Sequence, residues 1–472
     1  MDKSKSGEIG RRAGLRIQFR KEWGFKSLLL HQKGEQSMVK HANDNLLFSF
    51  IHHDAHECTA TITVKNPLVE ALYRHAILEQ KKHLQTDGFP RGMVPLSYIE
   101  STCRAYILDH LKEFFFNHSI ITFLCQELYS NKIVIAGEPI LKAITVDNAH
   151  ETQFIFTLKT INPNVKHEWK KFPFKSPARK NYKDLDRQVE TFLKEEEEKR
   201  KIAPKEGIQP SDWICFTVSI VSATEHQHTL ATYKSALWLK IGREEPDREA
   251  HELFIGKKVG DHFTTSSNFL QHYFSKKLDT QYLYDITIIE HVPAECFSLD
   301  LFKHHFKIKS VKELHQKFIE IFSFRNDISQ RREIVESAFK TLLKYYQISL
   351  PHTLVDDQEK LVLRALRRNP DYPVYKAQKD FARKVTLLAE KQLKEAILVD
   401  HIAQQEQIHI TQDDIKAYLN MLQRARTKEF IHFNLPTTQL SGQEQPLPAG
   451  ILHQACLREK TLNYIIQRLI HG

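Results

Sequence analysis

The spacing of hydrophobic and polar positions changes several times along this chain, and each change predicts a different kind of element. Between residues 45 and 66, two short stretches read LLFSFIHH and ECTATITVKN. In the second stretch Cys58, Ala60, Ile62 and Val64 lie on one face, with the two-residue period of a half-buried β-strand. The first structured region is therefore predicted to begin with two strands.

From residue 66 the apolar spacing changes to three and four residues. Asn66 and Pro67 are typical of a helix start, because proline is tolerated in the first turn. The apolar positions of the helix that follows are Leu68, Val69, Leu72, Tyr73, Ala76 and Ile77. A second helix is predicted from Pro95, and its inward positions are Leu96, Ile99, Cys103, Ile107, Leu111 and Phe114. A strand at 152–161 then closes a small α+β unit.

The rest of the chain divides into three stretches of different character. Residues 162–205 predict a connector whose one helix carries the run Glu195–Glu198 on a solvated face. Residues 206–292 contain short alternating segments separated by turn residues, which predict a small β-rich half-barrel that folds on its own. From residue 298 onward the spacing predicts a large all-α region, including one long helix from Lys376 to about Glu406.

Composition limits the class of protein. With 472 residues, 41% of them hydrophobic, the chain is long enough for about two to four globular domains. No apolar run reaches the roughly 18 residues of a membrane span. The six cysteines contain no CxxC pair, which is typical of a reducing compartment and not of a disulfide framework or a zinc site; they are Cys58, Cys103, Cys125, Cys215, Cys296 and Cys456. We therefore expect a cytoplasmic protein that does not span a membrane.

Positive charge is concentrated at the N-terminus. Of the formal net charge of +10, residues 1–37 contribute +5, from nine Lys/Arg and four Asp/Glu. A basic arm of this kind can bind RNA electrostatically. Two other interpretations stay open: a disordered tail, or a true start of the protein at Met38.

Few residues form a pattern that indicates catalysis. The sequence HHDAHEC, residues 52–58, is rich in metal-ligand types, but alternation along a strand directs neighbouring side chains to opposite faces. We find no phosphate-binding glycine loop and no catalytic triad pattern, and we expect neither a metal nor a cofactor. The helices are rich in phenylalanine, which fits either an ordinary core or a surface for unfolded chains; examples are Phe114, Phe115, Phe116, Phe318, Phe322 and Phe324.

A short motif between the first two helices points to a known family. The segment LQTDGFPRGMVPLSYIES, residues 84–101, places an aromatic residue in a loop of glycines and prolines. It resembles the ribosome-binding loop of trigger factors, the bacterial ribosome-associated chaperones, which reads Gly-Phe-Arg-x-Gly-Lys-x-Pro. Four positions match and a fifth is basic; they are Gly88, Phe89, Gly92 and Pro95, with Arg91 basic. Pro90 and Met93 depart from the motif and remove two positive charges.

The resemblance extends over almost all of residues 38–472 and implies an α+β multidomain fold. The implied parts are a basic extension at 1–37, a ribosome-binding head at 38–161, a linker at 162–205, an FKBP-like prolyl isomerase domain at 206–292 and an all-α chaperone domain at 293–472. The head would dock at the tunnel exit of the large ribosomal subunit through Gly88, Phe89, Arg91 and Gly92. The other partners would be nascent and unfolded polypeptides, and a homodimer is left open.

The stretch 206–292 departs from the isomerase pattern. Prolyl isomerisation needs an apolar pocket that desolvates the twisted imide bond. The family signature has an acidic-aromatic pair where this chain has Thr217-Val218, and an Ile-Pro-Gly where it has the charged run Asp247–Glu249. The side chains that could line a remnant of the groove are Val218, Trp238, Phe254 and Tyr284, although a core role explains them equally well.

The resemblance favours an ATP-independent chaperone that docks on the ribosome and shields nascent chains, with isomerase activity weak or absent and no residue assigned as catalytic. Two alternatives stay open. One is an active FKBP-type peptidyl-prolyl cis-trans isomerase, and the other is an RNA-binding protein that uses the basic arm at 1–37.

Overall fold

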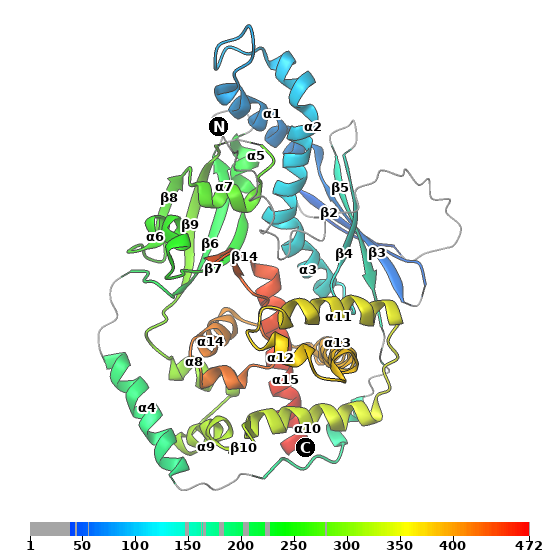
Figure 1. Cartoon of the computed structure of the whole chain (residues 1–472), viewed down its shortest axis with the longest axis vertical. Coiled ribbons are helices and arrows are strands. Elements are labelled where there is room, and N and C mark those ends of the chain that lie inside the picture. The colour runs from blue at the N-terminus through cyan, green and yellow to red at the C-terminus, as the bar shows by residue number, and fades with distance from the viewer. Residues whose placement is uncertain are drawn as a thin grey trace, which may run out of the picture.

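The computed structural model describes residues 38–42, 45–54, 56–146, 151–161, 163, 167–178, 184–201, 207–221, 227–278 and 281–471. The basic extension at 1–37 lies outside the described residues, and so do parts of the linker. The head and the middle region each combine an antiparallel sheet with helices, and helices dominate the C-terminal part, which confirms the predicted α+β multidomain class (Figure 1). Below, head means 38–161, middle region means 206–292 and helical region means 293–472.

The head contains an antiparallel sheet with strand order β1-β2-β3-β5-β4. The strands are β1 (Met38–Ala42), β2 (Leu46–His52), β3 (Glu57–Val64), β4 (Ile140–Val146) and β5 (Thr152–Lys159). Alternate side chains of the central strands are buried, among them Phe48, Ile62 and Phe156, so the two-residue period produces one apolar face. That face packs against the head helices in one continuous core.

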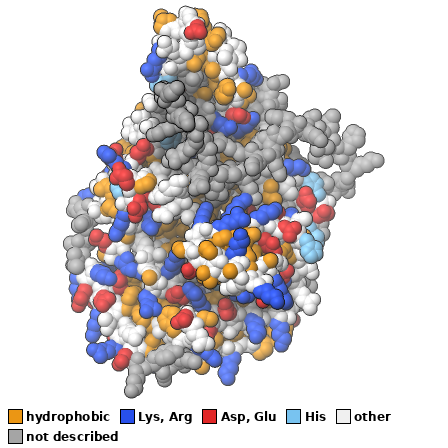
Figure 2. Space-filling view, in the orientation of Figure 1, with side chains coloured by type: hydrophobic (Ala, Val, Ile, Leu, Met, Phe, Trp, Pro, Cys, Tyr) orange, Lys and Arg blue, Asp and Glu red, His pale blue; other side chains and the backbone are white. Residues whose placement is uncertain are grey.

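Among its described residues the head has three α-helices, and the first two form a hairpin that makes the apex of the molecule (Figure 1). They are α1 (Asn66–His83), α2 (Leu96–Phe115) and α3 (Ile121–Ser130), and the π-helical turn Phe116–Ile120 joins α2 to α3. The predicted inward positions of α2 are largely correct, since Ile99, Ile107 and Phe114 are buried. Leu96 is the exception: it is 41% exposed because it begins the helix beside the apical loop. Hydrophobic side chains are visible on this apex in Figure 2.

The middle region is built around a second antiparallel sheet, of order β14-β7-β6-β9-β8. Its strands are β6 (Trp213–Val221), β7 (Ser235–Lys240), β8 (His262–Thr265), β9 (Leu283–Val292) and β14 (Leu447–Pro448). Three short helices lie among them: α5 (Gln227–Thr232), α6 (Arg248–Phe254) and α7 (Asn268–Phe274). Strand β14 comes from the helical region, so the stretch 206–292 lacks one strand of the sheet that it forms.

The connector helix α4 (Leu185–Lys201) packs along α9. The expectation that its glutamate run is fully solvated is wrong at one position. Glu196 is only 2% exposed, and its carboxylate pairs with Lys199 at 2.8 Å and with Arg424 at 3.5 Å. It also accepts a hydrogen bond from the backbone N–H of Phe297 at 3.3 Å. Glu196 therefore joins the connector to the helical region, which a run of identical charged letters could not reveal.

The helical region has two cores around its C-terminal helix. Its helices are α8 (Leu299–Phe306), α9 (Val311–Phe322), α10 (Gln330–Tyr345), α11 (His352–Leu366), α12 (Tyr372–Lys376), α13 (Phe381–Gln405), α14 (Gln412–Leu422) and α15 (Ala449–His471). Short hairpins are β10 (Phe324–Arg325) with β11 (Ile328–Ser329), and β12 (Gln439–Leu440) with β13 (Gln443–Glu444). The predicted long helix begins at Phe381 and not at Lys376, because a separate short helix precedes it. A capping box of Thr411 and Asp414 starts α14, as a Thr-x-x-acid pattern favours.

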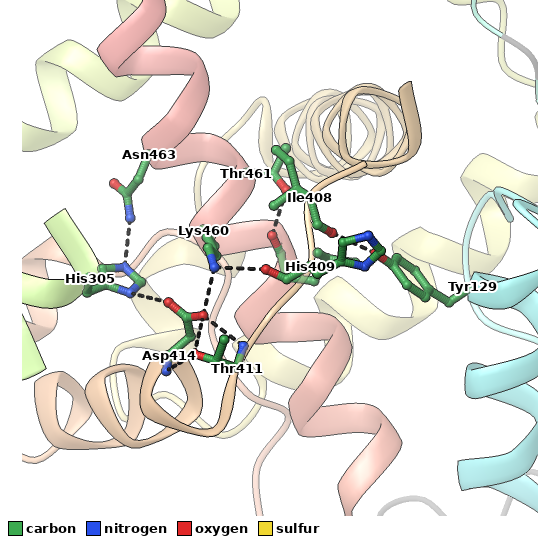
Figure 3. A network of polar contacts seen from close by, with 10 residues as sticks. Tyr129, His305, Ile408, His409, Thr411, Asp414, Lys460, Thr461 and Asn463 are labelled. Atoms are coloured by element: carbon green, nitrogen blue, oxygen red, sulfur yellow. Dashed lines mark hydrogen bonds and ion pairs between the residues drawn. The ribbon is translucent and has the colours of Figure 1, made fainter. Parts of the chain in front are cut away.

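The head rests directly on the helical region. Helix α3 packs on α15, where Gly450 permits the approach: a Cβ at this position would lie 3.1 Å from Cys125 and Thr122 atoms. Beside this contact, Tyr129 of α3 donates a hydrogen bond to the Ile408 carbonyl at 2.6 Å (Figure 3). Lys460 of α15 then reaches the His409 carbonyl at 2.8 Å, and its ammonium also pairs with the Asp414 carboxylate. This network fixes the head relative to the helical bundle.

Candidate functional site

The apical loop between α1 and α2 consists of two consecutive tight turns. The N–H of Phe89 donates to the Thr86 carbonyl at 3.1 Å, and the N–H of Met93 donates to the Pro90 carbonyl at 3.0 Å. Gly88 and Gly92 hold the third position of each turn with φ of +92° and +81°. A side chain would meet nothing at either glycine, so the backbone conformation, not space, requires them. The two turns make the loop a defined shape.

Buried and paired groups attach this loop to the helices below it. Val94 is fully buried and fixes the loop into the head core. Arg91 donates from Nε to the Lys82 carbonyl at 3.1 Å and from its terminal nitrogen to Nδ1 of His83 at 2.9 Å. A cation at the C-terminal end of a helix also interacts favourably with the helix dipole. Arg91 therefore caps α1, a structural role that the motif did not indicate.

The outer surface of the loop is apolar. Its exposed hydrophobic side chains, with their exposed fractions, are Phe89 at 37%, Met93 at 70%, Leu96 at 41% and Tyr98 at 40%. The rings of Phe89 and Tyr98 lie 6.2 Å apart between centroids, so Phe89 is held over the start of α2 and is not free. We call these four residues the tip patch. Exposed apolar side chains gathered in this way mark interaction sites, and two of the four, Leu96 and Tyr98, lie beyond the motif.

The face of the middle sheet that carries Val218 and Tyr284 packs against the head. We call it the concave face. The π-helical turn after α2 presents three polar residues to this face. Asn117 donates to the Phe274 carbonyl at 2.9 Å, His118 donates from Nε2 to the Val218 carbonyl at 3.2 Å, and Ser119 bonds the Tyr233 hydroxyl. A π turn inserts an extra residue into a helix, which is a common device for redirecting side chains.

Aromatic packing reinforces this covering contact. The ring of Phe114 lies 5.3 Å from Phe274 and 5.1 Å from His118, and the His118 ring stacks on Tyr233 at 4.7 Å. Nearby, Nε2 of His110 lies 2.5 Å from the Tyr282 hydroxyl. The apolar residues of the head and of the middle region consequently belong to one core.

Burial keeps the histidines of this interface neutral. It lowers the pKa of His110 and of His118 to about 3, and it also lowers the pKa of His75. The second ring nitrogen, Nδ1, of both His110 and His118 is buried with no hydrogen-bond partner among the described residues. A proton added there would have no acceptor, so protonation opposes the contact between head and middle region.

The four residues predicted as a groove remnant do not line an open groove. Val218 and Tyr284 are fully buried on the face that the head covers, and Phe254 of α6 is fully buried in the same core. The Tyr284 hydroxyl donates to Gln271 at 2.9 Å. Trp238 is also buried, but on the opposite face of the sheet, in a core shared with the helical region. Strand alternation explains the split, since neighbours on β7 face opposite ways.

The charged run at 247–249 has a structural explanation. Asp247 is fully buried, and its carboxylate accepts a hydrogen bond at 2.8 Å from the N–H of Glu444 in hairpin β12–β13. Gly242 makes room for it, because a Cβ there would lie only 1.7 Å from the carboxylate oxygen. Asp247 therefore ties the middle region to the helical region at the place where the isomerase signature would be apolar.

The described residues of the histidine-rich segment 52–58 lie at the end of β2 and the start of β3. The Asp54 carboxylate accepts hydrogen bonds from the N–H groups of His56 and Glu57 at 2.6 and 2.7 Å, and these bonds lower the pKa of Asp54. In the part of the chain that the structure describes, no three His, Cys, Asp or Glu side chains are placed to hold a metal ion. No described helix is long and apolar enough to cross a bilayer.

Comparison with known proteins gives consistent matches at both ends of the chain. Residues 49–194 match the family model of the bacterial trigger factor protein, and residues 310–467 match the model of its C-terminus. Together the two matches span more than half of the chain, and the middle region lies between them. Individual relatives agree. Trigger factor of Geotalea uraniireducens is 22% identical over 74% of this chain and 82% of the relative, and that of Enterococcus faecalis is 22% identical over 80% and 90%.

A solved structure of the trigger factor chaperone, studied for promiscuous substrate recognition in folding and assembly, also matches. It covers 89% of this chain and 98% of its own, with 14% identity and a TM-score of 0.32.

Proposed function

The chain belongs to the trigger factor family, a family of ribosome-associated chaperones that assist protein folding, and we propose that it docks on the ribosome through the tip patch of its head. The single observation that carries this proposal is the patch itself: four exposed apolar side chains at the apex, two on the tight turns of the loop and two on the first turn of α2. Preformed shape lowers the entropy lost on binding. The expected docking place is the large subunit at the tunnel exit, in the cytoplasm.

The residues of the loop have different roles from those that the motif implies. Gly88 and Gly92 set the turns, Arg91 caps α1, and the tip patch supplies the contact area. Pro90 and Met93 replace two cations of the family loop, so docking here relies on apolar contact more than on charge. At about 25 cal/mol per Å² of buried apolar surface, a few exposed side chains suffice for a reversible contact of moderate strength.

We propose further that the middle region is a structural module with little prolyl isomerase activity. Two observations support this: the head covers the concave face of its sheet, and a buried carboxylate, Asp247, occupies the signature position. In a protease-coupled prolyl-peptide assay, the whole chain should leave the rate near that of the uncatalysed reaction. A catalysed rate comparable to that of an ordinary FKBP-type enzyme would contradict this part of the proposal.

Cosedimentation with 70S ribosomes at physiological salt tests docking. The double variant Phe89→Ala, Met93→Ala should lose association, because it removes the phenylalanine ring and the most exposed apolar side chain of the tip patch. Tyr106→Ala is the matched control: this aromatic residue is 64% exposed on the same hairpin but lies outside the patch. Equal association of the wild type and the double variant would refute docking through this loop. Suppression of the aggregation of an unfolded client by both variants would show that chaperone activity is separate from docking.

A further inference from the structure

The turn that joins the two long helices α11 and α13 carries a dense group of cations. We call residues 364–384 the basic tip; they comprise the end of α11, the short helix α12 and the start of α13. Its positive residues are Arg364, Arg367, Arg368, Lys376, Lys379, Arg383 and Lys384, and its negative residues are Asp371 and Asp380. In Figure 2, basic and hydrophobic side chains lie together where Figure 1 draws α12.

The basic tip accounts for much of the excess positive charge of the chain. The whole sequence has 68 Lys/Arg and 58 Asp/Glu; residues 1–37 contribute nine and four, and the basic tip contributes seven and two. The remaining residues are therefore balanced, with 52 of each sign. A positive excess confined to one short structured segment creates a local field that favours a polyanion.

The cations of the basic tip are largely unpaired. Arg367, Arg368, Lys376, Lys379 and Arg383 make no ion pair with a carboxylate of the described residues. Cations elsewhere on the same two long helices are paired in the usual way: Lys360 with Asp357 at 2.8 Å, Lys391 with Glu336 at 3.5 Å and Lys394 with Glu390 at 3.2 Å. The five unpaired side chains are exposed, so they can reach phosphates without breaking an internal bond.

Aromatic residues are interleaved with these cations. Tyr372 packs on Phe381, with ring centroids 6.1 Å apart, and this contact closes the turn between α12 and α13. Tyr375, half-buried on α12, lies next to Lys376, and Val374 beside it is 65% exposed. Cations that follow a backbone, combined with aromatic faces that accept unpaired bases, are the common design of single-strand nucleic-acid sites.

We propose that the basic tip binds single-stranded segments of RNA, with the unpaired cations on phosphates and Tyr375 stacking on a base. This site lies on a different region from the tip patch and does not depend on it. The identification of ribosomal RNA as the natural ligand rests on the proposed function, because a ribosome-associated chaperone works beside exposed rRNA. An acidic unfolded polypeptide is the competing occupant, and the experiment below separates the two.

The test measures the binding of the full chain to a fluorescent oligouridylate of about 20 nucleotides by anisotropy, over a series of salt concentrations. The triple variant Arg367→Ala, Arg368→Ala, Arg383→Ala should bind about tenfold more weakly at low salt, and its log–log salt slope should fall by about 2, since each lost phosphate contact removes about 0.7 on a single strand. The matched control is the triple variant Lys360→Ala, Lys391→Ala, Lys394→Ala. It also removes three positive charges, from α11 and α13, but it should bind RNA like the wild type.

A second variant tests stacking. Tyr375→Ala should weaken RNA binding by about fivefold without changing the salt slope, because stacking releases no counterions. The proposal is overturned if the triple variant binds RNA like its control, or if deletion of residues 1–37 alone abolishes binding. It is also overturned if poly-glutamate of equal charge displaces the RNA as well as unlabelled RNA does, because the tip would then be a general polyanion site. Cosedimentation of the triple variant with ribosomes is a separate readout, so loss of docking and loss of RNA binding are distinguishable.

Discussion

The apical loop and the concave face of the middle sheet are both places where a protein of this family would contact polypeptide. They differ in solvent exposure and in what packs against them. The outer surface of the loop is exposed, and among the described residues its hydrogen bonds run within its own turns and to the end of α1. The concave face is buried, and the head fills it with Phe114, His118 and their neighbours. An apolar surface kept in solvent is available to a partner, whereas one that has become part of the core contributes to stability instead.

This difference explains why the motif is retained at one place and lost at the other. Two glycines with positive φ suffice to preserve the loop, because their role is local. A catalytic pocket needs a whole apolar cavity, and we propose that a domain contact and Asp247 take its position here. The comparison predicts that changes in the middle region alter stability, whereas changes in the loop alter docking.

The largest effect should come from isolating residues 206–292. The sequence alone predicts that this stretch folds by itself. The structure leads to a different expectation, because the fragment lacks β14 and exposes the concave face that the head covers. We expect no cooperative thermal transition and binding of a hydrophobic dye. A sigmoidal melt with dispersed amide resonances would show that the shared core is not required.

The next largest effect is expected for Phe114→Ala. The side chain is 1% exposed at the centre of the head–middle contact, and truncating a buried phenylalanine costs about 3–5 kcal/mol of unfolding free energy. Denaturant unfolding of the whole chain measures it. Tyr106→Ala, an exposed position on the same helix, should change stability by about 0.5 kcal/mol or less. Equal effects of the two variants would contradict the described packing.

Acidification should weaken the covered contact in a predictable direction. Because the pKa of folded His118 is depressed to about 3, its neutral form contributes stability above the unfolded pKa of about 6.5, and this stability is lost as pH falls toward 3. At about 1.4 kcal/mol per pH unit, the loss between pH 7 and 5 is about 2 kcal/mol. His118→Gln keeps a donor for the Val218 carbonyl. Between pH 7 and 5, its free energy of unfolding should fall by about 2 kcal/mol less than that of the wild type. Identical pH profiles would exclude His118 as a source of acid sensitivity.

The smallest effect should be that of Arg91→Ala. Its bonds to the end of α1 are exposed to solvent, so their loss should cost about 0–1 kcal/mol of stability. Amide hydrogen exchange of residues 84–95 should rise, since the cap restrains the loop. Lys81→Ala removes a cation from the same last turn of α1 without removing a bond of Arg91, and it should leave the exchange unchanged. A strong loss of ribosome association with unchanged loop exchange would instead assign Arg91 to docking itself.

Much of the fold follows from local patterns in the sequence. The helix start at Asn66, the capping box at Thr411 and the alternation in β3 are all set by neighbours in the chain. The sequence could not reveal Glu196 in a buried pair, Trp238 on the other face from Phe254, or β14 completing a distant sheet. Each of these depends on a contact with a residue more than 15 positions away, which no short pattern records.

The candidate site was likewise only partly predictable. The motif located Phe89 and the two glycines, because turn chemistry is local. It did not indicate Met93 and Tyr98 as exposed partners or Arg91 as a cap, since these roles depend on how the loop folds back over the helix ends.

The most direct test of docking through the tip patch places a photo-cross-linking residue, p-benzoylphenylalanine, at position 89 and, in a separate variant, at position 106. The two positions are exposed aromatic sites on the same hairpin, and only the first belongs to the patch. On irradiation with 70S ribosomes, position 89 should cross-link to a component of the large subunit, whereas position 106 should give little product. Equal cross-linking from both positions, or none from position 89, would contradict docking through this loop.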